Sequence, residues 1–201
     1  MQNQQSPAAL PDDLQACIEF HGHLCPGVVI GYCASKLALR ELSAGRSGDE
    51  EFIAIVENDT CAVNAIQWLT GCTFGKGNLF FHDYGKMVFT FASRESGRSL
   101  RLRLRDYDQP SAEELPEHLR RQRRIEFMLS RDPAVLFDVK QNPLDELPEP
   151  ARIRDSFACD MCGERAMVTR ACPGQLGTLC IPCYEKHLEN PDTSSRSIHE
   201  S

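Results

Sequence analysis

The sequence predicts an α+β core domain followed by a small metal-binding domain. In the first part of the chain, segments with helical spacing of apolar residues alternate with short apolar segments typical of strands. A proline-containing segment then interrupts this pattern, and two Cys-x-x-Cys pairs follow it. We therefore expect a core over residues 12–142, a linker over 143–156, a metal module over 157–190 and a disordered tail over 191–201.

Capping residues and apolar spacing place the helices of the core. Pro26 fits the first position of a helix that runs to about Leu42, and Gly71 ends the next helix. The segment 116–130 is expected to form a charged helix. The expected N-caps of the first three helices are, in chain order, Asp12 or Asp13, Cys25, and Asp59 or Thr60.

Alternating and apolar segments place the strands. In residues 99–105 leucine and arginine alternate, which predicts a strand with one face turned to the core. A turn at 83–85 suggests that the segments on either side of it pair with each other. The expected strands are residues 52–56, 79–82, 86–91, 99–105 and 134–141.

Composition excludes several classes of protein. The net charge of −7 argues against a surface built mainly for nucleic acid or anionic lipid, and no apolar run is long enough to cross a bilayer. The first residues carry no basic and apolar pattern of a secretory signal, so we expect a cytoplasmic protein. The 10 cysteines then stay reduced, which favours metal ligands, reactive thiols or buried apolar side chains over disulfides.

The strongest local signal is the pair of Cys-x-x-Cys motifs near the C-terminus. Two such pairs complete a tetrahedral four-thiolate site, and a domain this small needs a metal ion to fold. The order of knuckle, hairpin and ligand pair at a helix start resembles a treble-clef zinc finger. A redox dithiol set is the alternative, and Cys172 is left over as a filler or a reactive thiol. The predicted zinc ligands are Cys159, Cys162, Cys180 and Cys183.

Charge indicates what this module contacts. Residues 155–201 contain four basic and seven acidic side chains, and a four-thiolate zinc site adds further negative charge. Phosphate attraction supplies most non-specific nucleic-acid binding, so we expect the finger to contact protein rather than nucleic acid.

A second cluster of metal-ligating residue types lies just before the second helix. His21, His23 and Cys25 fall within five positions, and Cys61 lies at the start of the next helix. A thiol at a helix N-terminus loses its proton more readily, so these residues suit a transition-metal or nucleophile site. The alternative is that the histidines and thiols only fill or cap the core.

Two weaker patterns have simpler explanations. The glycine-rich segment 71–78 fails the phosphate-loop pattern, and we favour a tight loop around Cys72. Small residues lie on one face of the second helix, at Gly27, Gly31 and Ala38, which indicates close helix packing.

Two long segments carry a resemblance to a known family. These are FHGHLCPGVVIGYCASKLAL and VENDTCAVNAIQWLTGCTFGKGNLFFHDYGKMVFTF, in the expected order, with AVLFDVKQ following later. The chain resembles the FmdE family, which is named after a component of formylmethanofuran dehydrogenase. The C-terminal treble clef looks like the accessory domain that only some members carry.

The resemblance implies an α+β core, an intertwined homodimer and a metal or active site at the histidine–cysteine motif. It carries His21, His23, Cys25 and Cys61 over as candidate metal or catalytic residues. The residues it carries over with less weight, as candidate cofactor-binding residues, are Cys72, Lys76 and Asn78. Asn64 stands where the family is expected to have Asp, which alters the site if that carboxylate binds metal or moves a proton.

The family name assigns no reaction to this chain. The first hypothesis is a cytoplasmic metal-binding accessory or redox protein, with His23, Cys25 and Cys61 as core ligands and His21 as fourth ligand or proton relay. This hypothesis expects zinc in the finger and a second transition metal in the core. The alternative is a non-enzymatic regulatory or protein-interaction module, linked to transcription or metal sensing.

Overall fold

A computed structural model describes residues 10–106, 115–174 and 176–189 of the chain. Contacts within the chain divide it into two compact units, residues 1–151 and residues 152–201. The first unit therefore continues past residue 142, where we expected the core to end. The tail predicted over 191–201 lies outside the described residues.

Three helices of the first unit begin close to the expected positions. They are α1 (Asp12–His21), α2 (Pro26–Glu41) and α3 (Ala62–Thr70). Cys25 is the N-cap of α2, as predicted, with Pro26 at the first helical position. The other expected N-caps are wrong, since Pro11 precedes α1 and Cys61 precedes α3. The Asp13 carboxylate instead accepts hydrogen bonds from the Tyr32 hydroxyl and the Lys36 ammonium group of α2.

The five core strands form one sheet in the order β2-β1-β3-β4-β5. Strand β1 pairs in parallel with β2, and all other neighbours are antiparallel. The strands are β1 (Phe52–Val56), β2 (Leu79–Phe81), β3 (Val88–Ser93), β4 (Ser99–Leu104) and β5 (Phe137–Gln141).

The predicted pairing of residues 79–82 with residues 86–91 is wrong, because β1 lies between β2 and β3. Helix α3 carries the chain over the sheet and returns it parallel to β1, as a crossover connection does. Residues 82–86 then pass the end of β1. The His82 N–H donates to the Val56 carbonyl and the Lys86 N–H to the Glu57 carbonyl.

Two further helices lie between β4 and β5. Helix α4 (Glu117–Leu129) is the predicted charged helix, and only Met128 in it is buried. The predicted strand over 134–141 is half correct, because a single turn, α5 (Pro133–Leu136), precedes β5. The Asp132 carboxylate caps that turn by accepting the Ala134 N–H.

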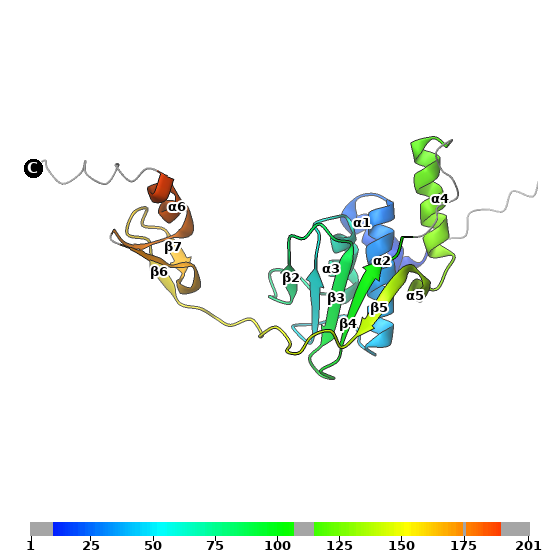
Figure 1. Cartoon of the computed structure of the whole chain (residues 1–201), viewed down its shortest axis with the longest axis horizontal. Helices are drawn as coiled ribbons and strands as arrows, with labels where there is room; N and C mark the ends of the chain where they lie inside the picture. The colour runs from blue at the N-terminus through cyan, green and yellow to red at the C-terminus, as the bar shows by residue number, and fades with distance from the viewer. Residues whose placement is uncertain (1–9, 107–114, 175, 190–201) are drawn as a thin grey trace, which may run out of the picture. The chain divides into compact units, whose positions relative to one another are not determined.

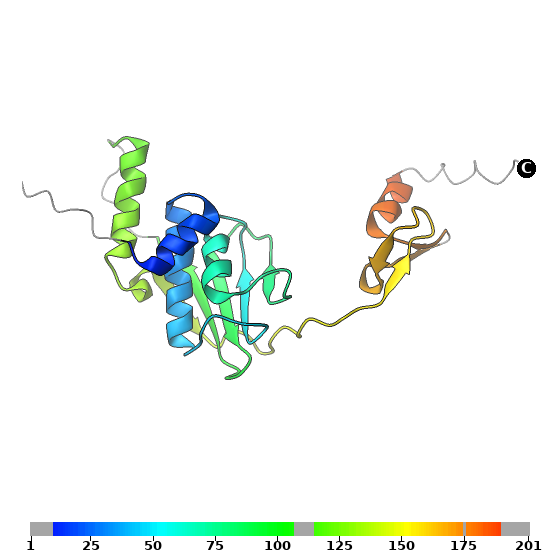
Figure 2. The ribbon, with the colours of Figure 1, turned by 180° about the vertical axis from the view of Figure 1, so that it is seen from behind.

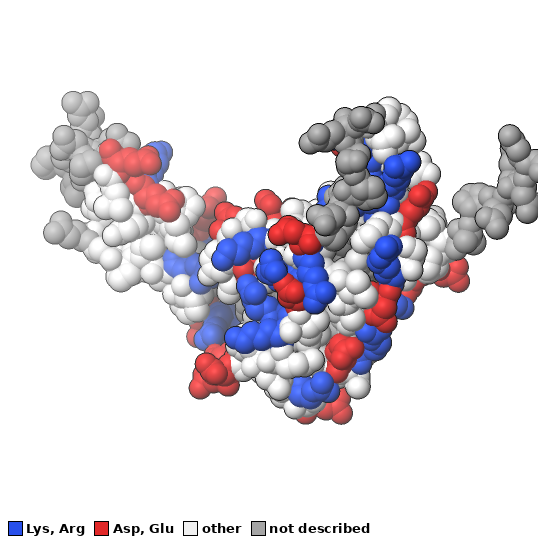
Figure 3. All heavy atoms as spheres, turned by 45° about the vertical axis from the view of Figure 1, so that its right-hand side comes forward, with Lys and Arg blue, Asp and Glu red and all other residues white. Residues whose placement is uncertain are grey.

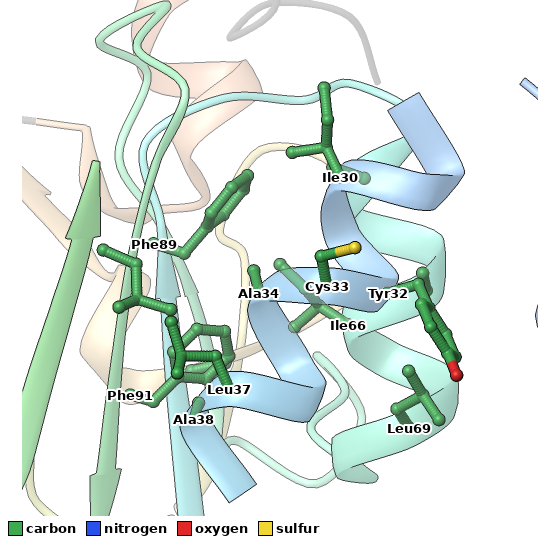
Figure 4. Close-up of a cluster of buried hydrophobic side chains, with 14 of the residues drawn as sticks. Ile30, Tyr32, Cys33, Ala34, Leu37, Ala38, Ile66, Leu69, Phe89 and Phe91 are labelled. Atoms are coloured by element: carbon green, nitrogen blue, oxygen red, sulfur yellow. The ribbon is translucent and has the colours of Figure 1, made fainter. Parts of the chain in front are cut away.

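Helices α1, α2 and α3 cover one face of the sheet, as the two opposite views show (Figures 1 and 2). The main core forms there, and Figure 4 shows Leu37 of α2 beside Phe91 of β3. Both side chains are almost completely buried, and each such burial contributes roughly 1.5–3 kcal/mol. Leu100 and Leu102 of β4 face this core, as their alternation with arginine predicts.

Two glycines of α2 let it approach α3 closely. A side chain at Gly27 would place its Cβ 2.8 Å from the Cβ of Cys61. A Cβ at Gly31 would clash with the carbonyl group of Ala62. The close helix packing predicted from these small residues is confirmed, and it brings the starts of α2 and α3 together.

The segment after β5 crosses the other face of the sheet. Leu144 and Leu147 pack there against Ile53, Ile55 and Ala92, which form a small second core. We call residues 143–151 the strap. Its apolar contacts explain why this proline-containing segment belongs to the first compact unit.

One arginine ties the strap to the sheet. The Arg94 guanidinium donates to the Pro148 carbonyl at 2.7 Å and to the Glu50 carbonyl at 3.0 Å.

The Arg94→Ala substitution should therefore release the strap and destabilise it by about 2 kcal/mol, the value typical of hydrogen bonds to a charged group. Hydrogen exchange of residues 143–151 measures this, with the exposed Arg98→Ala as the control. Equal protection in wild type and Arg94→Ala would contradict the prediction.

Mixed charges cover the rest of this face, and Figure 3 shows Lys and Arg interspersed with Asp and Glu. Arg101 pairs with Glu57 at 2.9 Å, and Arg103 and Arg105 both pair with Asp138. Neighbouring carboxylates therefore neutralise the positive charge of the arginines on this face.

The second unit is built from two short hairpins and a helix. The apolar residues buried in it are few: Cys159, Leu179 and Cys180, with partly buried Phe157, Ala166, Cys183 and Tyr184 around them. Its elements are β6 (Ser156–Ala158), β7 (Arg165–Met167), η2 (Val168–Arg170), β8 (Cys172–Gly174), β9 (Gly177–Leu179) and α6 (Ile181–Glu189).

None of the helices in the described part of the chain is long and apolar enough to span a membrane.

Candidate metal centres

The first candidate centre lies where α1 joins α2, in residues 21–25. Helix α1 ends at His21, and Gly22 follows in the left-handed conformation with φ of 100°, which turns the chain. Cys25 then begins α2 as its N-cap. This short connection holds His21, His23 and Cys25 on one side of the molecule.

The donor atoms of these three residues all lie within 4.8 Å of one another. The Cys25 Sγ is 3.8 Å from the His21 Nε2, and the two imidazole centroids are 4.6 Å apart. His23 is exposed, while His21 and Cys25 are half-buried. The cluster is therefore open to solvent on one side. We call it the His/Cys cluster.

Cys61 lies next to this cluster and is not part of the three-donor set. It is the N-cap of α3, in contact with the start of α2. Partial burial and the neighbouring Cys25 thiol raise the pKa of Cys61. The expectation that a helix N-terminus would favour its thiolate is therefore wrong for Cys61, because burial and a second thiol outweigh the helix end. Asn64 follows, half-buried, in the first turn of α3.

The three weaker candidates make structural contacts. The Asn78 amide is buried, donates to the carbonyls of Asp49 and Phe52, and accepts the Thr73 N–H. The Lys76 ammonium group donates to the carbonyls of Ser47 and Gly48. These contacts tie the loop 71–78 to residues 47–52.

Cys72 is fully buried, and its Sγ lies 3.3 Å from the Phe52 carbonyl. Burial raises its pKa to about 11, which keeps it a thiol. The tight loop that we favoured for this segment accounts for all three residues, and cofactor binding by Cys72, Lys76 and Asn78 gains no support from these contacts.

The second candidate centre is a four-cysteine cluster in the second unit. The Sγ atoms of Cys159, Cys162, Cys180 and Cys183 all lie within 4.8 Å of one another. The first pair comes from the knuckle after β6, and the second from the end of β9 and the start of α6. The Cys162 and Cys180 sulfur atoms are 3.9 Å apart.

Backbone groups and neighbouring thiols set the protonation of these cysteines. Backbone N–H groups of Cys162 and Cys180 lower the pKa of Cys159 to about 6. Hydrogen bonding with the Cys180 thiol, together with burial, raises the pKa of Cys183 to about 12. A set of four thiolates this close needs a cation to be stable, and such a donor set suits a metal ion such as zinc.

The sequence located both clusters but did not identify which donors meet in the core. Three of the four core candidates come together, and the set includes His21 in place of the expected Cys61. The position of Cys61 depends on how closely α2 approaches α3, and the only sequence signal of that approach was the small residues at Gly27 and Gly31.

Comparison with known proteins agrees with the fold and the motifs. A curated protein of Archaeoglobus fulgidus named "Probable S-adenosyl-L-methionine-binding protein" is 32% identical over 189 residues, which cover 82% of this chain and 50% of that protein. The chain thus spans about half the length of this relative. A crystal structure of a protein from Syntrophus aciditrophicus, described as similar to the FmdE component of a tungsten formylmethanofuran dehydrogenase, has the same fold. Its TM-score is 0.65 at 24% identity, covering 87% of this chain and 91% of that chain.

The sequence model of the family described as "FmdE, Molybdenum formylmethanofuran dehydrogenase operon" matches residues 20–146. This match includes the His/Cys cluster, Cys61 and every strand of the core sheet. It covers more than half of the chain, and the protein therefore belongs to the FmdE family.

Proposed function

We propose that this protein is a metal-binding accessory or redox-related member of the FmdE family, with a functional ion in the core and a structural zinc ion in the second unit. The observation that carries the proposal is the convergence of the His21, His23 and Cys25 donor atoms within 4.8 Å. Imidazole and thiolate donors together suit zinc, copper, iron or nickel.

The exposure of the His/Cys cluster supports a functional rather than a structural role. Structural sites are closed by four protein ligands, whereas functional sites keep a position open to water or substrate. Here three donors converge and His23 is exposed. A bound ion would supply Lewis-acid or electron-transfer chemistry at that open position. The His21 Nε2 lies 3.8 Å from the Cys25 Sγ, so the imidazole and the thiol face the same point.

The four-cysteine cluster supports a structural role for zinc in the second unit. All four ligand positions come from protein thiols, and Cys159 and Cys180 are buried. No open position remains for a substrate once the four thiolates surround an ion.

We further propose that a second copy of this chain covers α4, as the family resemblance implies. Leu24 and the helix residues Ile125 and Leu129 line an open groove of about 1040 Å³. Helix α4 buries only Met128 within the first unit. An apolar groove on a helix with so little burial is typical of a surface that another chain covers.

The metal content of the full-length protein tests the core centre. In wild type prepared anaerobically, we expect zinc in the finger and a second ion in the core. Cys25→Ala should lose the core ion and keep the finger zinc, because it removes the only thiolate of the cluster. Element analysis after gel filtration measures both ions.

The matched control is Cys33→Ala, which removes a buried thiol from the same helix outside the cluster. It should keep both ions. Wild-type protein that binds only the finger ion under reducing conditions would overturn the proposed core centre.

A further inference from the structure

Two partly exposed thiols lie at the starts of neighbouring helices in the core. Cys25 is the N-cap of α2 and Cys61 is the N-cap of α3, and both are half-buried. Only Cys25 belongs to the His/Cys cluster. The proposed metal centre therefore leaves the Cys61 thiol without an assigned role.

The packing of α2 on α3 holds these two thiols side by side. Gly27 is two residues after Cys25, and a Cβ at that position would lie 2.8 Å from the Cβ of Cys61. Four residues later, Gly31 contacts the backbone of Ala62, which directly follows Cys61. The two helix starts thus touch at both points, and the Cys25 side chain interacts with the Cys61 thiol.

The other core thiols are not available for such chemistry. Cys17, Cys33 and Cys72 are at most 2% exposed. Their burial keeps an oxidant in solution from reaching the sulfur atoms. Thiol exchange needs a thiolate and access to the sulfur. Among the core cysteines, Cys25 and Cys61 are the pair that has the access.

We infer that Cys25 and Cys61 form a reversible disulfide, which removes the Cys25 thiolate from the His/Cys cluster. The pairing itself depends only on the two thiols. Its consequence, that oxidation releases the core ion, rests on the proposed function. Cys61 is then the resolving thiol of an oxidation-sensitive metal centre. This role explains why a thiol lies beside the metal donors without being one of them.

A low-molecular-weight disulfide is a sufficient oxidant for joining the two thiols. The Cys25 thiolate attacks one sulfur of the oxidant, whose S–S bond breaks and releases a first thiol. The Cys61 thiolate then attacks the Cys25 sulfur of the mixed disulfide and releases a second thiol. The two protons of the cysteines end on the two released thiols, and the oxidant takes up the two electrons. A dithiol reductant reverses both steps.

Trypsin offers a direct readout. No Lys or Arg precedes Lys36, so cleavage gives fragment 1–36 with Cys25 and fragment 47–76 with Cys61. Full-length protein is treated with oxidised glutathione, its remaining thiols are alkylated, and the digest is analysed by mass spectrometry without reduction. We expect the two fragments to be linked, and dithiothreitol to separate them.

Matched variants show which thiols are joined. The two fragments also contain Cys17, Cys33 and Cys72, which are buried. Cys17→Ala, Cys33→Ala and Cys72→Ala should leave the link intact, whereas Cys25→Ser and Cys61→Ser should abolish it. Gly27→Ala keeps every thiol but pushes the helix starts apart, and it should slow linkage about tenfold because disulfide geometry is narrow. Unlinked fragments in oxidised wild type, or a link that persists in Cys61→Ser, would overturn the disulfide.

Adding zinc in a second experiment tests the disulfide and the core metal centre independently. Zinc added before the oxidant should slow linkage in wild type, because it occupies the Cys25 thiolate. If the disulfide forms at the same rate with and without zinc, the pairing stands and the core metal centre fails. If metal binds and no link forms, the metal centre stands and the disulfide fails.

Discussion

Cys159→Ser should unfold the second unit while the first unit stays folded. Metal binding by a four-thiolate site contributes about 10–16 kcal/mol to the folding of such small domains, far more than their apolar contacts supply. Among the described residues of this unit, the buried apolar cluster consists of Cys159, Leu179 and Cys180, and two of these three are themselves ligands. Loss of one ligand thus removes the ion and the centre of the core together.

Hydrogen exchange on the full-length protein measures this result separately for residues 152–189 and for the core. The control is Cys172→Ser, which removes a thiol of β8 outside the four-cysteine cluster. It should retain the ion and the protection of the hairpins. Full protection of residues 152–189 in Cys159→Ser would show that the unit folds without its metal ion.

Gly31→Ala should destabilise the first unit by about 3 kcal/mol, at the upper end of the range for overpacked cores. The new Cβ would clash with the backbone carbonyl group of Ala62, which cannot move aside as a flexible side chain does. Helices α2 and α3 must separate to admit it. The same movement displaces Cys25 from Cys61, so disulfide linkage should weaken together with stability.

Urea denaturation followed by far-ultraviolet circular dichroism measures the free energy of unfolding of this variant. Gly45→Ala is the control, because a Cβ at that exposed position meets no atom within 4 Å. It should change stability by a few tenths of a kcal/mol at most. A Gly31→Ala variant as stable as wild type would mean that the two helices do not pack as closely as described.

Local signals predicted much of the fold. Pro26 and Cys25 defined the start of α2, and the alternation of leucine and arginine defined β4, because both depend on neighbouring residues only. The pairing of β2 could not be predicted in the same way. A turn at 83–85 suggests a hairpin, but the crossover through α3 places β2 parallel to β1.

The same difference applies to the candidate sites. Spacing in the sequence was enough to predict two sets of neighbouring donors, because each set lies within a few consecutive residues. These sets are Cys159 with Cys162, and His21 with His23 and Cys25. The position of Cys61 depended on a contact between two helices, and the strap depended on apolar residues that reach the far side of the sheet. The strap has few residues with periodic spacing, so its prolines indicated a free linker.

The short connection between α1 and α2 has a consequence for the order of events during folding. The entropy lost on closing a loop grows with its length, and the donors of the His/Cys cluster lie within five consecutive residues. The nascent chain can therefore gather these donors as soon as this stretch is synthesised, before any strand of the sheet exists. An ion captured that early would stabilise the junction between the first two helices and favour their docking.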